Sequence, residues 1–420
     1  MAQKIPTNPD VVIIGAGSAG LAAGQELARA GISYVIVEAA NRVGGRAYTE
    51  SDRLGAPVDH GCSWINGSSN PFRRIGDLNG FTLVDHTSAG TDLFDIDGNP
   101  ASATEMAAYD RAYGAFERAL GRAGKAGKDI PASEVIPAMP YSAAVQTWEG
   151  PLNMSVDWDQ VSTADWWNTA SAQPSQIVHE GLGAIVATLA GEQPIALGTS
   201  VNNIDWSGSG VSVGTSAGTI RAKACILTVS MGVLQAEKIK FTPALPAAKQ
   251  EAIHDIQMGL LVKIPLLFDG TRLGLTENNW VTYRIPEDAV GEACYYLAWP
   301  TGHDYMMGFV GGRFGWSLYA EGQEAVVDYA LEQLFRIVGS DARKHFIKGF
   351  ASDWADNPLT LGAYGAVRPG KHGARDIVQE TLGDRVFFAG EAVAGELYGL
   401  VNGAYFSGKS AAQSVAKTLG

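Results

Sequence analysis

The feature that most constrains this chain is a glycine-rich turn near its start, between an apolar run and an alanine-rich segment. Val11–Ile14 has the length and the β-branched content of a buried parallel strand. Leu21–Ala30 predicts a helix, and Gly31 follows it at a position where a left-handed cap is common. Tyr34–Val37 predicts a second strand. This order of elements is typical of the start of a parallel α/β sheet.

The glycines of this turn, Gly15, Gly17 and Gly20, have the spacing GxGxxG. The first permits a tight turn, the second lets the backbone approach a pyrophosphate, and the third lets the helix pack closely on the strand. The helix N-terminus offers unpaired N–H groups to the diphosphate. Glu38 ends the second strand, where a carboxylate can accept hydrogen bonds from an adenosine ribose. An ordinary strand–turn–helix is the alternative in a chain with 51 glycines, but the combination favours a dinucleotide site.

Composition limits the remaining choices. A chain of 420 residues exceeds what one core usually sustains, so two domains are expected. The three cysteines, Cys62, Cys225 and Cys294, are too few and too scattered for a disulfide framework or a metal cluster, and they suit a reducing, cytoplasmic compartment. We expect no signal peptide before the first strand and no membrane span. The net charge of −13 argues against a nucleic-acid partner.

A second glycine-rich segment follows the dinucleotide pattern. Ala39–Thr49 (AANRVGGRAYT) carries Gly44 and Gly45, which let the backbone run close to a flat or phosphorylated group. Arg46, next in the chain, offers a planar donor fork. By themselves these residues fit a glycine turn with a surface arginine equally well. Together with Glu38 they resemble the second signature of the flavin-containing amine oxidase family, which implies that the chain binds FAD and that Arg46 lies near its diphosphate.

Two more segments carry the same resemblance. Val58–Gly67 (VDHGCSWING) is similar to the part of polyamine oxidases that passes the flavin ring and enters the substrate cavity, although Asn66 stands where those enzymes usually have histidine. The C-terminal motif FAGE…VNGAYFSG predicts a strand over Val386–Ala389 and a helix from near Leu400. Many members have an aromatic residue at the position of Leu400, so the two-ring amine cage is incomplete. Tyr398 is the candidate replacement.

The segment Trp354–Gly370 (WADNPLTLGAYGAVRPG) also resembles the family. Tyr364 matches one aromatic wall of the amine site, and Trp354 matches the tryptophan against the flavin ring. Ala363 stands where monoamine oxidases attach FAD through a cysteine. The resemblance therefore implies that FAD is held without a covalent bond.

Lys263 is the candidate catalytic residue. It lies in Gly259–Phe268 (GLLVKIPLLF), where both faces of a strand would be apolar. Burial lowers the pKa of a lysine and makes it usable as a base or as a donor to water. The alternative is an edge-strand lysine whose ammonium reaches solvent, and Pro265 is typical of an edge or a bulge. In the family, a lysine in an equivalent strand hydrogen-bonds a water beside flavin N5, which favours a catalytic role for Lys263.

Carried over residue by residue, the resemblance gives a full set of site residues. The expected cofactor-binding residues are Gly15, Ala16, Gly17, Ser18, Gly20, Glu38, Ala39, Gly44, Gly45, Arg46, Cys62, Ser63, Trp64, Val201, Trp354, Gly390, Glu391 and Val401. The expected substrate-binding residues are Trp64, Asn66, Tyr364, Tyr398 and Leu400. No metal site is expected.

Residues 148–167 are rich in tryptophan and acidic residues. A cationic ligand could bind such a cluster through ring faces and charge. We favour the simpler interpretation, which is a set of packing tryptophans with solvated acids.

The expected fold class is α/β. A Rossmann-like FAD-binding domain, with a parallel sheet and a small antiparallel meander, is expected over residues 1–75, 176–255 and 370–420. An α+β substrate domain is interleaved with it, over 76–175 and 256–369.

The resemblance implies an FAD-dependent amine oxidase closest to the polyamine oxidases. The expected reaction removes a hydride from the carbon next to a neutral amine and gives an imine that hydrolyses to an aldehyde or ketone. Oxygen, as acceptor, would be reduced to hydrogen peroxide. An L-amino-acid oxidase stays open and would need an arginine clamp, for which Arg73, Arg74, Arg284 and Arg313 are available. A dehydrogenase with a protein acceptor and a non-enzymatic flavoprotein also stay open, as does the oligomeric state, a homodimer included.

Overall fold

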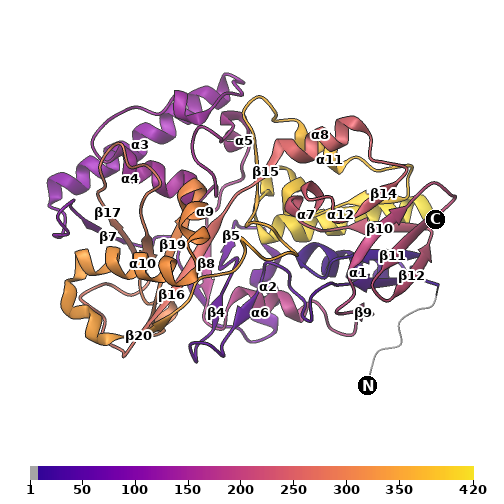
Figure 1. The fold of residues 1–420 in the computed structure, drawn as a ribbon, viewed down its shortest axis with the longest axis horizontal. Helices are drawn as coiled ribbons and strands as arrows, with labels where there is room; N and C mark the ends of the chain where they lie inside the picture. Colours follow the sequence, from indigo (N-terminus) through magenta and orange to yellow (C-terminus); the bar gives the residue numbers. More distant parts are fainter. Residues whose placement is uncertain (1–7) are drawn as a thin grey trace.

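The computed structural model describes residues 8–420, and Figure 1 shows two lobes along the long axis of the molecule. One lobe contains a five-stranded parallel sheet of order β22-β13-β1-β2-β9. Its strands are β1 (Val11–Ile14), β2 (Tyr34–Val37), β9 (Ile195–Ala196), β13 (Ala224–Leu227) and β22 (Val386–Phe388). The first two strands have the predicted bounds, and all their residues are buried, which explains their continuous apolar sequence.

The two faces of this sheet belong to different cores. Val11 and Ile13 pack in a cluster with residues of α1 (Ser18–Arg29) and α12 (Val401–Leu419), while Val12 and Ile14 pack in another with residues of the meander. This division follows from the alternation of side chains along a strand. The helix α1 begins three residues before the predicted start, because the glycine turn feeds directly into it and Gly17 is its N-cap.

The expected meander is confirmed as a four-stranded sheet of order β12-β11-β10-β14. Its strands are β10 (Val201–Asp205), β11 (Val211–Thr215), β12 (Gly218–Ala222) and β14 (Lys240–Thr242), of which β14 runs parallel to β10. The helices that complete this lobe are α7 (Met231–Gln235), α8 (Ala247–Asp255) and α11 (Ala374–Gln379). The fold class is therefore the predicted α/β class.

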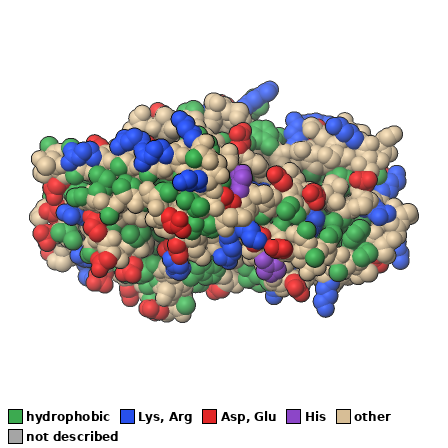
Figure 2. Space-filling view, turned by 90° about the horizontal axis from the view of Figure 1, so that it is seen from above, with side chains coloured by type: hydrophobic (Ala, Val, Ile, Leu, Met, Phe, Trp, Pro, Cys, Tyr) green, Lys and Arg blue, Asp and Glu red, His purple; other side chains and the backbone are tan. Residues whose placement is uncertain are grey.

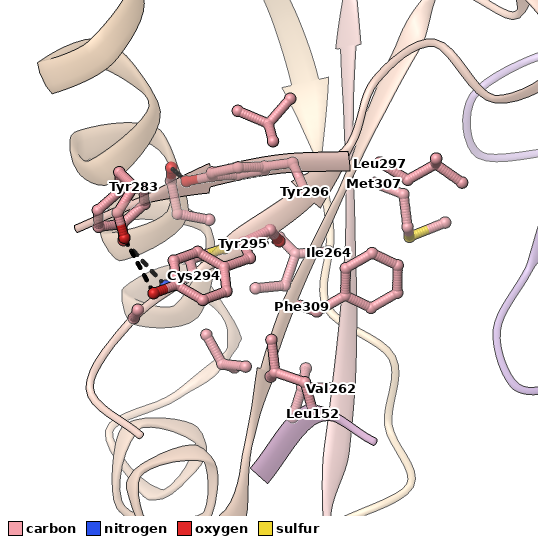
Figure 3. Close-up of a cluster of buried hydrophobic side chains, with 14 of the residues drawn as sticks. Leu152, Val262, Ile264, Tyr283, Cys294, Tyr295, Tyr296, Leu297, Met307 and Phe309 are labelled. Atoms are coloured by element: carbon pink, nitrogen blue, oxygen red, sulfur yellow. Dashed lines mark hydrogen bonds between the residues drawn. The ribbon is translucent and has the colours of Figure 1, made fainter. Parts of the chain in front are cut away.

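The other lobe contains a six-stranded sheet of order β20-β16-β19-β18-β17-β7. Its strands are β7 (Thr91–Phe94), β16 (Leu261–Phe268), β17 (Trp280–Tyr283), β18 (Tyr295–Leu297), β19 (Tyr305–Gly311) and β20 (Phe346–Gly349). The helices of this lobe are α3 (Ala103–Lys125), α4 (Ser142–Thr147), α5 (Thr163–Trp167), α9 (Gly312–Ala320) and α10 (Gln323–Val338). Figure 3 shows its core, in which Ile264 and Phe309 lie beside Tyr295.

Short sheets lie between these two assemblies. A three-stranded sheet contains β5 (Trp64–Asn66), β8 (Ser175–Val178) and β6 (Leu83–Asp85), and the helices α2 (Pro71–Leu78) and α6 (Leu182–Thr188) pack near it. The two-stranded sheets are β3 (Thr49–Glu50) with β4 (Val58–Asp59) and β15 (Ile256–Met258) with β21 (Gly365–Val367). The strand β5 thereby carries Trp64 and Asn66 to the junction of the lobes.

The expectation of solvated acids in residues 148–167 is wrong for two of them. Asp165 is buried and forms an ion pair with Arg375. The Glu149 carboxylate accepts hydrogen bonds from Tyr113 and Asn153 inside the large cavity described below. Tyr113 comes from α3 and Arg375 from α11, both outside this segment, so local charge patterning gave no indication of these contacts.

Candidate active site

A cavity of about 1220 Å³ runs from the carboxyl ends of β1 and β2 to β16 and the helices α3 and α5. It is larger than the roughly 300–1,000 Å³ typical of small-ligand pockets. The predicted residues on its wall are Gly15, Gly17, Ser18, Glu38, Ala39, Gly44, Gly45, Arg46, Cys62, Ser63, Trp64, Asn66, Val201, Lys263, Trp354, Tyr364, Gly390, Glu391, Tyr398, Leu400 and Val401. Ala16 and Gly20 lie behind the wall.

The glycine turn forms one end of the cavity. Gly15 has φ +106°, a conformation that favours glycine, and a Cβ there would lie 2.5 Å from Thr228 Oγ1. A Cβ on Gly20 would lie 1.9 Å from the Gly15 carbonyl oxygen, so only glycine lets α1 approach the turn this closely. Ser18 Oγ donates to the Val401 carbonyl, which ties the start of α1 to the start of α12. The N-termini of both helices therefore meet at this cavity.

Glu38 is fixed at the end of β2 by the backbone around it. Its Oε2 accepts a hydrogen bond of 2.7 Å from Ala16 N, and its Oε1 accepts one of 2.7 Å from Ala40 N. Each carboxylate oxygen keeps acceptor capacity for a further donor in the cavity. Ala39 and Val201 lie on the same part of the wall. Glu38 can therefore accept hydrogen bonds from the two hydroxyl groups of a ribose bound at this end of the cavity.

Arg46 joins the N-terminal part of the site to the C-terminal part. It follows Gly44 and Gly45, whose φ values are +97° and +58°. Its Nη1 donates to Glu391 Oε1 at 2.8 Å and to the Ala363 carbonyl at 2.7 Å. The guanidinium is thus held in place, with its charge balanced by Glu391, on the cavity wall.

Lys263 lies in the middle of the cavity wall and is 3% exposed. Its Nζ donates to the Asp59 carbonyl at 3.2 Å and to Ser63 Oγ, and it lies 5.3 Å from the centre of the Trp64 ring. Burial lowers the pKa of Lys263 to about 8, although the nearby Asp59 charge opposes this shift. An ammonium has three donors, and the two described bonds leave one for a group in the cavity.

The edge-strand alternative for Lys263 is wrong, because β16 lies between β19 and β20. The pairing with β20 covers Leu266–Phe268, with an irregularity between Leu267 and Phe268. From Pro265 back to Lys263, residues 350–352 cover the strand instead. There Ser352 N donates to the Lys263 carbonyl at 2.9 Å, and Lys263 N donates to Ser352 Oγ at 3.0 Å. The ammonium therefore cannot reach bulk water past a sheet edge.

Several aromatic side chains line the same cavity as Lys263. Trp354 is buried and donates from Nε1 to the His60 carbonyl at 2.8 Å. Tyr364 donates to the Asn153 carbonyl at 3.0 Å, and the Tyr398 hydroxyl accepts a hydrogen bond from Thr169 Oγ1 at 2.7 Å. These bonds hold the three side chains on the cavity wall, where their rings offer apolar surface.

Comparison with known proteins then decides the family. Residues 18–92 and 141–416 match the family of flavin containing amine oxidoreductases. The chain belongs to this family.

Several known relatives align over almost the whole chain. It is 29% identical to polyamine oxidase 4 of Oryza sativa subsp. japonica, over 99% of this chain and 90% of that protein. It is 29% identical to polyamine oxidase 2 of Arabidopsis thaliana, over 97% of this chain and 88% of that protein. The structure of a putrescine oxidase redesigned for cofactor binding superposes with a TM-score of 0.80 at 20% identity, over 98% of this chain and 99% of that one. This likeness shows a shared fold.

As a flavin-containing amine oxidoreductase, the chain is an FAD-dependent enzyme that acts on CH–NH groups. The cavity fits the cofactor on three observations: a glycine turn at a helix N-terminus, a carboxylate with free acceptor capacity, and a volume beyond that of an ordinary ligand pocket. Among the described residues, no group of three or more His, Cys, Asp or Glu could hold a metal ion. No helix within residues 8–420 is long and apolar enough to cross a membrane.

Several wall residues of this amine oxidoreductase were missed from the sequence. Tyr113 and Glu117 lie four residues apart in α3, on one face of the helix. Glu149 lies in a π-helix, Trp148–Leu152, and accepts hydrogen bonds from the Tyr113 hydroxyl and from Asn153 Nδ2. Burial raises the pKa of the Glu149 carboxyl. The four-residue spacing in α3 was an available signal, whereas the π-helix, a form common at functional sites, was not visible in the sequence.

Asp59 is a further residue that was missed from the sequence. Its buried carboxylate accepts hydrogen bonds from the N–H groups of Leu182 and Gly183, at the start of α6, and from Thr49 Oγ1 at 2.5 Å. Burial raises its pKa, while the charge of Lys263 opposes the shift. Asp59 thus anchors the loop whose carbonyl holds the catalytic candidate Lys263.

Proposed function

We propose that this enzyme is an amine oxidase for diamines and polyamines. The observation that carries the proposal is the carboxylate of Glu149, which lies on the wall of the same cavity as the aromatic side chains and Lys263. Glu117 lies on the same wall. A substrate with two amino groups can place one beside Lys263 while the other pairs with Glu149. The names of the plant relatives, polyamine oxidases of rice and Arabidopsis, support the same substrate class.

The proposed roles divide along the cavity. The residues around the glycine turn, together with Glu38 and Arg46, bind the dinucleotide. The remaining predicted cofactor residues contact the rest of FAD along the cavity as far as Trp354. When bound, FAD accepts a hydride from the carbon next to the amine. Ala363 has no side-chain nucleophile, which supports non-covalent binding. Oxygen is the proposed acceptor.

The side chains around the cavity favour the neutral form of the amine and can hold or transfer a proton. An alkylamine in water has a pKa near that of lysine, about 10.4, and hydride removal requires the neutral form. The apolar wall disfavours the ammonium by desolvation, as it does for Lys263 itself. As an ammonium, Lys263 donates its remaining N–H to a water there, and as a neutral amine its Nζ accepts a proton. With a pKa of about 8, Lys263 can take either state near neutral pH.

An L-amino-acid oxidase is not favoured by this cavity. It would need an arginine to bind the substrate carboxylate, and none of Arg73, Arg74, Arg284 and Arg313 lines the wall. Among the described residues, Arg42 and Arg46 are the arginines that do, and Arg46 is paired with Glu391. The division of the chain into domains, the cytoplasmic location supported by three free cysteines, and a homodimer stay predictions.

A panel of amines tests the proposal. Purified protein is mixed with an alkyl monoamine, a diamine, a triamine and an L-amino acid in air, and peroxide formation is followed. We expect the highest kcat/KM for the diamine or triamine. Peroxide formation with the amino acid alone, or with none of the four, would contradict the proposal.

Glu149→Gln tests the observation that carries the proposal. A hydrogen bond to a charged group is worth about 1.5–3 kcal/mol, so we expect kcat/KM for the best polyamine to fall about 10- to 100-fold. The monoamine, which has no second ammonium, should be oxidised at an unchanged rate. Glu324→Gln, an exposed change in α10, is the matched control. An equal loss for monoamine and polyamine would remove Glu149 from substrate recognition.

A further inference from the structure

A buried ion pair joins α5, which borders the cavity, to α11, which lies outside the cavity wall. Asp165 in α5 is 3% exposed and Arg375 in α11 is 5% exposed. The pair is bidentate, with Nε donating to Oδ1 at 3.0 Å and Nη2 donating to Oδ2 at 2.7 Å. Neither side chain lines the cavity. A bidentate pair of this kind fixes the direction of the guanidinium plane as well as its position.

The fixed guanidinium lies against Tyr398. Its central carbon is 3.7 Å from the centre of the Tyr398 ring, and Nη1 donates to the Ala392 carbonyl at 2.7 Å. Because Tyr398 lines the cavity and Arg375 does not, the ring separates the guanidinium from the cavity. Arginine can stack on a ring and bind a carboxylate bidentately at the same time, whereas the point charge of lysine cannot.

The hydroxyl of Tyr398 is held by the segment that carries Asp165. It donates to the Asp165 carbonyl at 3.2 Å and accepts from Thr169 Oγ1 at 2.7 Å. One step further along, Ala170 N donates to the Glu396 carbonyl at 2.8 Å. The wall segment after α5 and the wall segment before α12 therefore meet at this ring, and the ion pair lies directly behind it.

We propose that Arg375, held by Asp165, is a positioning residue that fixes the Tyr398 ring as a wall of the amine site. The guanidinium takes one face of the ring, so a bound amine contacts the other face. The inference rests on the proposed function, because it assumes that the amine lies against Tyr398. It adds a determinant of substrate affinity that lies outside the cavity and leaves the reacting atoms untouched.

Arg375→Lys is the first test, with Arg313→Lys as the matched control. Arg313 forms an exposed bidentate pair with Asp159 and does not line the cavity, so its change should leave all constants as in wild type. For Arg375→Lys we expect KM for the best amine to rise about three- to thirtyfold, the range that one ring contact is worth. We expect kcat and bound FAD to stay within about twofold of wild type, because the reacting atoms are untouched.

A double variant separates positioning from a general loss of structure. Tyr398→Leu should raise KM by a similar factor, and adding Arg375→Lys should raise it no further, because the ring it positions is gone. Should Arg375→Lys not fold, Thr169→Val removes the hydrogen bonds of Thr169 Oγ1 to the Tyr398 hydroxyl and to the Asp165 carbonyl, and it should also raise KM. An unchanged KM in the folded variant, or additive effects in the double variant, would overturn the proposal.

A readout independent of turnover completes the test. The crystal structure of FAD-bound Arg375→Lys should show the Tyr398 ring in another rotamer or without a fixed position. A Tyr398 ring in the same position as in wild type would contradict the proposal, whether or not the protein oxidises any amine. If wild type oxidises none of the amines, the proposed function is contradicted instead.

Discussion

Lys263 and Asp59 are two buried charges, and each opposes the pKa shift that burial imposes on the other. The ammonium is enclosed by β16 and by the loop after β4, and Asp59 meets the N-terminus of α6 with its carboxylate while its carbonyl holds the ammonium. Enclosing both charges is costly, since each loses water. The structure compensates with backbone N–H groups on one side and with the attraction between the two residues on the other. The net result is a lysine with a lowered pKa beside the cavity.

Burial of Lys263 makes a prediction about stability and pH. The pKa of Lys263 is about 8 in the folded chain, whereas an ordinary exposed lysine, as in the unfolded chain, has a pKa of 10.5. Between pH 8 and pH 10.5 the unfolded chain therefore binds more protons than the folded chain. The contribution of Lys263 to stability therefore rises with pH from about 8 to 10.5. In FAD-free protein, Lys263→Met should be stabilised relative to wild type below pH 8, and this difference should shrink by about 3 kcal/mol as the pH rises to 10.5.

Urea unfolding of both proteins at pH 7.5, 9 and 10.5 measures this difference. Lys249, whose pKa burial also lowers to about 8, is present in both proteins, so its effect cancels. A difference between the two proteins that does not change with pH would show that Lys263 titrates normally in the folded chain.

The elements of the cofactor end depend on close contacts between backbones. The turn after β1 brings α1 so near that Gly20 has no room for a side chain, and α12 crosses α1 where a Cβ on Gly408 would lie 1.9 Å from the Ala19 carbonyl oxygen. These contacts place two helix N-termini at the cavity. The glycines in this part of the chain are therefore structural requirements of the cofactor site.

Gly20→Ala tests this requirement. The new Cβ would overlap the Gly15 carbonyl oxygen, and overpacking of this kind costs about 1–3 kcal/mol of unfolding free energy. We expect the variant to unfold at lower urea and to bind less FAD. Gly208→Ala, in a turn where a Cβ meets nothing within 4 Å, is the control and should match wild type. FAD binding and stability equal to wild type in Gly20→Ala would contradict the account of the turn.

The sequence predicts elements that are determined by their own residues, but it does not predict contacts between elements that are far apart in the chain. The strands β1 and β2 have their predicted bounds because four buried apolar residues between turns define them. The apolar faces of its own strand made burial of Lys263 one of two interpretations, and the neighbours of β16 in the sheet decide between them. Glu149 and Asp165 were misjudged because their partners, Tyr113 and Arg375, come from other elements. No spacing in the sequence connects these pairs.

At the scale of the whole molecule, the cavity is assembled from both ends and the middle of the chain. Its wall takes Gly15 from the start, Lys263 from the second lobe and Val401 from the last helix. Figure 2 shows acidic, basic and apolar side chains interspersed over one face of the molecule, so the net charge of −13 is not gathered into one patch there. The charges that matter for an amine lie within the cavity.

We predict that FAD is bound without a covalent bond, by contacts from both lobes of the molecule. Heating or acid precipitation should release yellow FAD into the supernatant, since Ala363 offers no thiol for attachment. The absorbance of the supernatant and of the redissolved pellet measures the partition. Colour that stays with the polypeptide would contradict non-covalent binding.

Anaerobic titration with the best polyamine, followed at the flavin absorption band, tests whether the bound FAD oxidises the amine. We expect one equivalent of amine to bleach one bound FAD in wild type, and Lys263→Met to keep its FAD but to bleach, or to recover in air, much more slowly. Protein that binds FAD and is bleached by no amine, or that remains colourless when offered FAD, would contradict this expectation.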